Sequence, residues 1–285
     1  MSARRILITG AKGLLGRTLV RQWSDKYTLI ATDRDDLDIT DANACTSRIA
    51  HERPDMVVHC AAYTAVDRCE SEREDAFRLN AIGSANVAVA SHRVGARMIA
   101  ISTDYIFSGE ASRPYNEWDE PEPRTVYGAS KLAGESAVRA HCPDHVIARI
   151  AWLYGAGGPS FVHTMLRLGE QTGDPLRVVA DQIGNPTSTD AVAVGLTHLI
   201  EHDIAGTVHL TCAGETSWHG FTEEILRLRG LHRSLQPCTT AEFPRPAPRP
   251  ANSRLDKMAL RLHGLPPMPS WQDALASFFH AYPNG

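Results

Sequence analysis

One short stretch near the N-terminus sets the fold: Thr9-Gly10-Ala11-Lys12-Gly13-Leu14-Leu15-Gly16. Its glycines are spaced G-x-x-G-x-x-G, between an apolar run that ends at Thr9 and a helical pattern that begins at Leu14. Gly10 permits a tight reversal, Gly13 lets a phosphate approach the backbone, and Gly16 allows close packing of helix on sheet. The pattern therefore predicts a strand–turn–helix unit whose helix N-terminus accepts phosphate groups.

Apolar runs and amphipathic helical segments alternate along the first half of the chain. Near-continuous apolar strands separated by helices indicate a parallel sheet that is covered on both faces. We expect an α/β fold, a Rossmann-like doubly wound parallel sheet that binds ligands beyond the carboxyl ends of its strands. The predicted strands are Arg5–Thr9, Tyr27–Thr32, Pro54–Cys60, Arg97–Ser102 and His145–Ile150, and the predicted helices are Leu14–Trp23, Ala42–His51, Asp75–Val94 and Val126–His141.

The character of the sequence changes after residue 150, where glycine- and proline-rich loops become frequent. We expect residues 1–150 to form an NAD(P)-binding Rossmann domain and residues 151–285 mainly a smaller C-terminal substrate-binding lobe, with segments at about 173–211 returning to the main sheet. The stretch Phe243–Pro250, F-P-R-P-A-P-R-P, can form neither a helix nor a central strand, because proline lacks an N–H donor. It is either a disordered linker or a rigid loop that presents Arg245 and Arg249 to a ligand.

The composition is that of an ordinary globular chain. It has 285 residues, a formal net charge of −4, 43% apolar and 22% charged residues. The acidic balance argues against nucleic acid as the main partner, and no apolar run is long enough for a membrane span or a signal peptide. The six cysteines form no C-x-x-C pair and no metal-ligand set is evident. We therefore expect reduced thiols, no bound metal and a cytoplasmic location.

Two neighbouring residues bear on which dinucleotide the glycine turn binds. Asp33 ends the second predicted strand and lies 20 residues after Gly13, close to the position expected for a contact with the ribose. Its carboxylate suits the 2′-hydroxyl of NAD, whereas Arg34 suits the 2′-phosphate of NADP. The cofactor is thus NADPH or NADH, and the sequence leaves the choice open.

A second motif carries acid–base chemistry. Tyr127-Gly128-Ala129-Ser130-Lys131 places a phenol and an ammonium group on the same face of a predicted helix. A nearby lysine favours phenolate and so makes a tyrosine a usable general acid. Thr103 follows a predicted strand at the ligand-binding edge, where its hydroxyl can polarise a substrate carbonyl. Tyr127, Lys131 and Thr103 are therefore the predicted catalytic residues.

These motifs together resemble the extended short-chain dehydrogenase/reductases and, more narrowly, the dTDP-4-dehydrorhamnose reductase family. The resemblance runs over almost the whole chain, and its most distinctive parts are the S-T-D-Y-x-F run and the late P-R-P-x-x-S-x-L pattern. Segments that carry it are Thr9–Gly16, Cys60–Asp67, Ser102–Phe107, Tyr127–Lys131, Trp152–Gly155, Asp181–Gly184 and Arg245–Leu255.

The resemblance implies a role for each matching residue. It makes Tyr127 the proton donor with Lys131 as its partner, and it makes Thr103 a hydrogen-bond donor to the carbonyl. The cofactor would be contacted by Gly10, Lys12, Gly13, Leu14, Leu15, Gly16, Asp33, Arg34, Asp38, Ile39, Ala61, Ala62, Tyr63, Tyr127 and Lys131, and the sugar nucleotide by Thr103, Asp104, Tyr105, Trp152 and Arg249.

The chain departs from the family pattern at one position of the glycine turn. Some relatives carry acidic residues that bind Mg²⁺ at a dimer interface, and one of those positions is the apolar Leu15 here. The resemblance is therefore compatible with a homodimer but not with that magnesium site.

The implied activity is NAD(P)H-dependent reduction of dTDP-4-dehydro-β-L-rhamnose to dTDP-β-L-rhamnose. A related dTDP-4-keto-6-deoxyhexose is an alternative substrate, because epimeric sugars differ by only a few hydrogen bonds in one pocket. A regulatory subunit without catalytic activity, which keeps the fold and binds a partner, is an alternative of another class. An epimerase or dehydratase would retain its cofactor through the cycle, so stoichiometric consumption of NAD(P)H separates those activities from a reductase.

Overall fold

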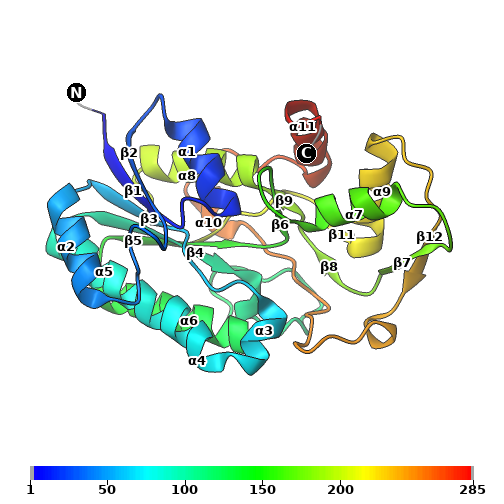
Figure 1. Ribbon diagram of the computed structural model, residues 1–285, viewed down its shortest axis with the longest axis horizontal. Helices are drawn as coiled ribbons and strands as arrows, with labels where there is room; N and C mark the ends of the chain where they lie inside the picture. The colour runs from blue at the N-terminus through cyan, green and yellow to red at the C-terminus, as the bar shows by residue number, and fades with distance from the viewer. Residues whose placement is uncertain (1–2, 284–285) are drawn as a thin grey trace.

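A parallel sheet of six strands forms the centre of the computed structural model, which describes residues 3–283 (Figure 1). The strand order is β10-β5-β4-β3-β1-β2, so the chain runs outward from β1 to one edge and then returns to build the other. This confirms the predicted doubly wound parallel sheet. The strands are β1 (Arg5–Thr9), β2 (Thr28–Thr32), β3 (Met56–His59), β4 (Arg97–Thr103), β5 (His145–Ile150) and β10 (Gly206–His209).

Apolar side chains on both faces of the sheet explain why the strands read as continuous hydrophobic runs. In β1, Ile6 and Ile8 enter one core with α1 and α8, whereas Leu7 enters a second core with α2, α5 and α6. Side chains alternate between the two faces of a strand, so both cores need apolar residues from every strand. The helices are α1 (Leu14–Trp23), α2 (Ala42–Glu52), α5 (Ser84–Arg93), α6 (Val126–His141) and α8 (Thr189–Glu201).

The predicted helix Asp75–Val94 is interrupted, and that prediction is corrected. The segment consists of α4 (Arg73–Phe77), a π-helical turn η1 (Arg78–Gly83) and α5, and it follows α3 (Val66–Ser71). The wider turn lets Asn80 point inward, where its side chain accepts from the N–H of Tyr63 at 2.8 Å and donates to the hydroxyl of Ser130 at 2.9 Å. Single π-turns of this kind are common beside functional sites, whereas a 3.6-residue periodicity predicts an unbroken α-helix.

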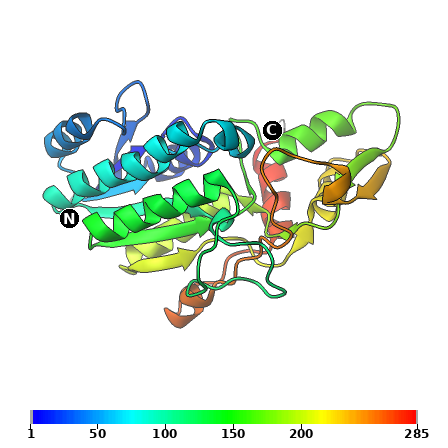
Figure 2. The ribbon, with the colours of Figure 1, turned by 90° about the horizontal axis from the view of Figure 1, so that it is seen from below.

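The remaining elements form a lobe beside the carboxyl ends of the strands (Figures 1 and 2). Three short strand pairs, β6–β9, β7–β12 and β8–β11, build it together with α7 and α9. The elements of the lobe are β6 (Leu153–Tyr154), α7 (Phe161–Gly169), β7 (Leu176–Val179), β8 (Ile183–Gly184), β9 (Thr187–Ser188), β11 (Thr216–Ser217), α9 (Trp218–Leu228) and β12 (Leu235–Cys238). The last two helices of the chain are α10 (Met258–Leu262) and α11 (Trp271–Ala281).

Three elements after residue 150, α8, β10 and α10, lie with the main sheet rather than with the lobe. Helix α8 packs beside α1, β10 pairs with β5 at the edge of the sheet, and α10 packs against β10. The division into 1–150 and 151–285 stays a prediction. No helix among residues 3–283 is long and apolar enough to cross a membrane.

Candidate active site

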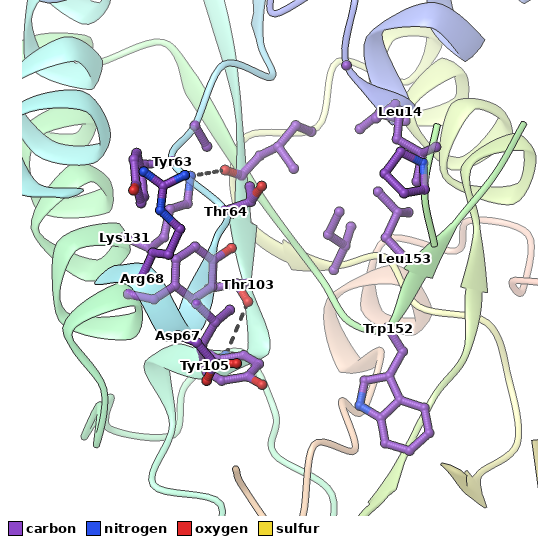
Figure 3. A pocket seen from close by; sticks show the side chains of 18 of the residues that line it. Leu14, Tyr63, Thr64, Asp67, Arg68, Thr103, Tyr105, Lys131, Trp152 and Leu153 are labelled. Carbon is purple, nitrogen blue, oxygen red and sulfur yellow. Dashed lines mark hydrogen bonds between the residues drawn. The ribbon is translucent and has the colours of Figure 1, made fainter. Parts of the chain in front are cut away.

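All of the predicted site residues line one cavity, which has a volume of about 1500 Å³. It lies where strands β1, β3, β4 and β5 end, and the lobe closes its far side. Figure 3 shows two walls that face each other across it, one with Lys131, Thr103 and Tyr105 and the other with Leu14, Leu153 and Trp152. Sequence positions more than 200 residues apart, such as Gly10 and Arg249, thus border the same space.

The glycine turn is packed so closely against other backbone that a side chain at Gly10 or Gly16 would clash with it. Gly10 has a φ of +66°, and a Cβ atom there would lie 2.7 Å from the amide nitrogen of Ala61. A Cβ atom on Gly16 would lie 2.2 Å from the carbonyl oxygen of Gly10. Helix α1 begins after Gly13, and no side chain caps its first N–H groups. These residues therefore fit the diphosphate of a dinucleotide, which accepts hydrogen bonds from an uncapped helix N-terminus.

Replacing Gly16 with alanine is expected to weaken dinucleotide binding. An alanine inside an exposed helix normally adds up to about 1 kcal/mol of stability over glycine. Here the new methyl group would push backbone against backbone, which costs roughly 1–3 kcal/mol and displaces the turn. Calorimetric titration with NADPH should show a higher dissociation constant for Gly16→Ala, and urea unfolding should show a lower stability.

Gly195→Ala is the matched control, because its Cβ atom would meet only the side chains of Leu210 and Met268, at 3.1 Å. That variant should bind NADPH with unchanged affinity. Equal affinities for Gly16→Ala and the native protein would show that the turn does not hold the dinucleotide.

The carboxylate of Asp33 braces this turn from the end of β2. One of its oxygens accepts from the N–H of Lys12 at 2.7 Å, and the other accepts from the N–H of Arg34 at 2.8 Å. Arg34 itself is exposed at the rim of the cavity. The structure therefore brings both residues to the cavity and keeps the choice between NADH and NADPH open.

Tyr127 and Lys131 lie one helical turn apart on α6, and both are buried. The helix starts where the side chain of Thr125 accepts from the N–H of Gly128 at 2.9 Å. The ammonium group of Lys131 donates to the carbonyl oxygen of Ile101 at 2.7 Å. The ring of Tyr127 meets that of Tyr105 edge to face, with 5.5 Å between centroids. Both side chains are thus held in place before any ligand binds.

Burial dominates the electrostatics of this pair. It raises the pKa of Tyr127 well above its ordinary value, although the nearby Thr103 hydroxyl opposes this effect. Burial also lowers the pKa of Lys131 to about 8, with Glu135 opposing. The expected lowering of the Tyr127 pKa by Lys131 is not seen, because burial outweighs it and the ammonium group is bound to Ile101. The buried phenol is therefore in its protonated, proton-donating form.

Thr103 and Asp104 lie side by side where β4 ends. The hydroxyl of Thr103 donates to Oδ1 of Asp104 at 3.0 Å and accepts from the N–H of Tyr105 at 3.3 Å. Within residues 3–283, Oδ2 of Asp104 has no hydrogen-bond partner although it is buried. Burial raises the pKa of this carboxyl to about 6. A buried acceptor of this kind needs a partner, and the cavity that it borders is where a ligand would supply one.

Trp152 is held in an unusual position on the opposite wall. Its φ is +48°, a left-handed conformation that is strained for a large side chain. Its ring stacks on Trp218 with 3.5 Å between centroids, and it also lies close to Gly184, where a Cβ atom would be 2.4 Å from Cε2 of Trp152. Sequence patterns contain no signal for Trp218, because its neighbours indicate only the start of a helix.

The proline-rich stretch is an ordered loop that forms part of the cavity lining. The carboxylate of Asp67 accepts from the N–H of Ala247 at 3.2 Å and pairs with Arg249 at 2.9 Å. Ala247 is fully buried, and Arg245 also lines the cavity. Of the two alternatives drawn from the sequence, these contacts favour the rigid loop.

Leu15, the position of the glycine turn that departs from the family pattern, is buried in the structure. Leu15 is an apolar core residue, 4% exposed, and no group of three or more metal-type ligands occurs among residues 3–283. An apolar side chain offers no oxygen ligand to Mg²⁺, so Leu15 itself cannot hold the ion.

Fold and site together define a Rossmann-type protein of the extended short-chain dehydrogenase/reductase class. Within that class the chain belongs to the RmlD substrate binding domain family, whose model matches residues 4–283. This confirms the resemblance drawn from the sequence motifs.

Individual relatives match over nearly the full length. The chain is 44% identical to a dTDP-4-dehydrorhamnose reductase of Streptomyces griseus, with 97% of this chain and 93% of the relative covered. It is 41% identical to a probable dTDP-4,6-dihydroxy-2-methyloxan-3-one 4-ketoreductase of Streptomyces antibioticus, with 96% and 94% covered. The crystal structure of dTDP-4-dehydrorhamnose reductase from Bacillus anthracis strain Ames, in complex with NADP, is 41% identical and has a TM-score of 0.96, with 99% of this chain and 100% of that chain covered.

Proposed function

We propose that the chain reduces dTDP-4-dehydro-β-L-rhamnose to dTDP-β-L-rhamnose with NADH or NADPH. The observation that carries this proposal is the single cavity that joins a dinucleotide-type glycine turn to Tyr127, Lys131 and Thr103. The family membership and the NADP-bound relative support the same activity.

The chain's own residues divide the work of reduction. When bound, the reduced nicotinamide supplies a hydride to C4 of the keto sugar. Tyr127 gives its phenol proton to the carbonyl oxygen, so that a C–H bond and an O–H bond form together across the former double bond. Thr103 exchanges its hydrogen bond to Asp104 for one to the same oxygen while negative charge develops on it. Lys131, one helical turn from Tyr127 on α6, carries a positive charge that favours the tyrosinate until solvent returns its proton, although burial outweighs this effect in the ligand-free protein.

The substrate side of the cavity suits a sugar nucleotide. Asp104 offers a buried acceptor to sugar hydroxyls, Tyr105 and Trp152 offer flat apolar surfaces, and Arg249 offers positive charge to a diphosphate. The rings of Tyr105 and Trp152 are held by their aromatic neighbours, which favours one orientation of the substrate over others.

Absorbance at 340 nm tests the proposal directly. Purified protein is mixed with dTDP-4-dehydrorhamnose and either NADH or NADPH, and one nicotinamide should be oxidised for each sugar reduced. Cofactor consumption without a reduced sugar, or no consumption at all, would overturn the assignment. If no cofactor is consumed although NADPH binds tightly, the result would favour the regulatory subunit without catalytic activity.

A related dTDP-4-keto-6-deoxyhexose is the second candidate substrate. It is favoured by the 41% identity to the ketoreductase of Streptomyces antibioticus. A panel of dTDP-keto sugars, compared by kcat/KM, decides between the two, because a hydrogen-bonding site rejects a poorly matched epimer in the transition state.

Replacing Arg34 with alanine is expected to weaken the binding of NADPH but not the binding of NADH. If the exposed guanidinium group binds a 2′-phosphate, Arg34→Ala loses a charge-assisted hydrogen bond and the dissociation constant of NADPH rises about tenfold or more. The dissociation constant of NADH should not change, so it serves as the internal control in the same titration. Equal changes in the dissociation constants of both dinucleotides would show that Arg34 does not recognise the 2′-phosphate.

We also propose a cytoplasmic location and a homodimer. Cell fractionation tests the first proposal, and light scattering during size-exclusion chromatography tests the second. Because Leu15 offers no oxygen ligand to Mg²⁺, we expect EDTA in the column buffer to leave the elution position unchanged.

A further inference from the structure

A buried carboxylate lies one helical turn beyond Lys131 on α6. Glu135 is 3% exposed and receives hydrogen bonds from three side chains. The guanidinium group of Arg149, itself 2% exposed, donates from Nε at 3.0 Å and from Nη2 at 2.9 Å. Ser102 donates to the same carboxylate, and Arg139 donates from the outer side at 2.8 Å. A charge buried this deeply is stable only because its partners satisfy it.

These contacts join α6 to the end of β4 at consecutive residues. Lys131 binds the carbonyl oxygen of Ile101, and Glu135 binds the hydroxyl of Ser102. The next residue of the strand is Thr103, whose hydroxyl faces the cavity with Tyr127. The contact of Lys131 with Ile101 and the contact of Glu135 with Ser102 therefore fix how α6, which carries Tyr127, is aligned with β4, which carries Thr103.

Glu135 is also the negative charge that faces Lys131. From the end of β3, Cys60 and His59 face the ammonium group, but burial raises the pKa of the Cys60 thiol to about 12 and lowers the pKa of His59 to about 3. Both are therefore neutral near pH 7. Burial opposes ionisation of Glu135, yet Arg149, Ser102 and Arg139 together bring its net pKa below the ordinary value.

We propose that Glu135 is a positioning residue of the reaction: its carboxylate holds α6 against β4 and keeps the ammonium group of Lys131 charged. As a statement about catalysis this rests on the proposed function, since it concerns the proton donor of that reduction. Glu135 itself is not among the residues that line the cavity, whereas Lys131 is. Its partner Arg149 extends the contact to the carbonyl oxygen of Glu117 at 3.4 Å.

The lysine content of the chain makes the proposal directly measurable. There are four lysines, Lys12, Lys26, Lys131 and Lys257, so protein labelled with ¹³C at lysine Cε gives four signals. The signal of Lys131 is assigned by its loss in Lys131→Arg. In the ligand-free protein Glu135→Gln, which keeps the hydrogen-bonding shape but removes the charge, should lower the titration midpoint of Lys131 by roughly one pH unit.

Kinetics give the second readout. Lowering the Lys131 midpoint by one unit reduces the fraction of charged Lys131 about tenfold at pH values above the midpoint. At pH values well below the midpoint the charged fraction hardly changes. In Glu135→Gln, kcat/KM should therefore fall about tenfold near pH 9 and stay close to the native value near pH 6. Arg139→Met is the matched control, because it removes a partner of the same carboxylate that is 38% exposed and screened by solvent. Its titration and pH profile should follow those of the native protein.

The outcomes separate the possible explanations. An unshifted Lys131 titration in Glu135→Gln, or a loss of activity that is equal at all pH values, would overturn the proposal and leave a purely structural role. If the single variant does not fold, the double variant with Glu135→Gln and Arg149→Met removes both buried charges and should show the same shift. A shifted titration in a protein that does not reduce the keto sugar would contradict the proposed function, not the effect of Glu135 on Lys131.

Discussion

Tyr127→Phe is expected to lower kcat by about 10²–10⁴-fold, the range for loss of a positioned general acid. The phenol oxygen is the only part of the side chain that is removed, and the ring keeps its edge-to-face contact with Tyr105. Because α6 and the glycine turn are unchanged, the dissociation constant of NADPH and the melting temperature should stay close to their native values. Stopped-flow measurement of the first turnover separates the reduction itself from product release.

Tyr27→Phe is the control for this experiment. Tyr27 is also buried, lies outside the cavity, and has a hydroxyl oxygen without a hydrogen-bond partner among residues 3–283. Its loss should change neither kcat nor KM. A Tyr127→Phe protein that turns over at a near-native rate would remove Tyr127 from proton transfer and leave Thr103 or a bound water as the donor.

The parts of the fold that follow from local chemistry were predictable. The turn from Gly10 to Gly16, the apolar runs of the strands and the helical pattern from Val126 each depend on residues close together in the chain. Parallel strands bring their carboxyl ends to one edge, so Gly10, Thr103 and Tyr127 could be placed near one another without coordinates.

Features that depend on distant partners were not predictable. The stack of Trp152 on Trp218 requires the lobe to fold back over the sheet, and the left-handed backbone at Trp152 has no signature in a residue type that rarely adopts it. The π-helical turn at Arg78–Gly83 is stabilised by contacts of Asn80 with Tyr63 and Ser130, which periodicity cannot register. Likewise Glu135 reads as an ordinary helical glutamate until β5 brings Arg149 beside it.

The distribution of charge around the cavity differs from that of the whole chain. The formal net charge is −4, yet the residues that line the cavity include eight lysines and arginines against six aspartates and glutamates. A cavity with low-dielectric walls focuses such a local excess, and it attracts anionic ligands faster than the total charge indicates. Binding of two diphosphate-bearing molecules is therefore compatible with an acidic protein, and it should weaken as salt is raised.

Arg149→Met is expected to destabilise the protein by about 3–5 kcal/mol, the usual effect of removing one partner from a buried ion pair. Methionine retains much of the apolar stem, so the loss comes mainly from Glu135, which keeps only Ser102 and the half-exposed Arg139. The guanidinium group also lies 5.3 Å from the ring of Phe107, a contact that the variant loses. Thermal unfolding should show a midpoint lower by on the order of 10 °C.

A double-mutant cycle shows whether this effect belongs to the pair. Once Arg149 is methionine, changing Glu135 to glutamine removes a buried charge that has lost its main partner, so the second change should restore part of the stability. In the native background Glu135→Gln should destabilise, because Arg149 then keeps its buried charge beside a neutral amide. Additive effects in the cycle would mean that Glu135 and Arg149 act separately. Arg139→Met, the change at the exposed end of the same network, should shift the free energy of unfolding by less than about 1 kcal/mol.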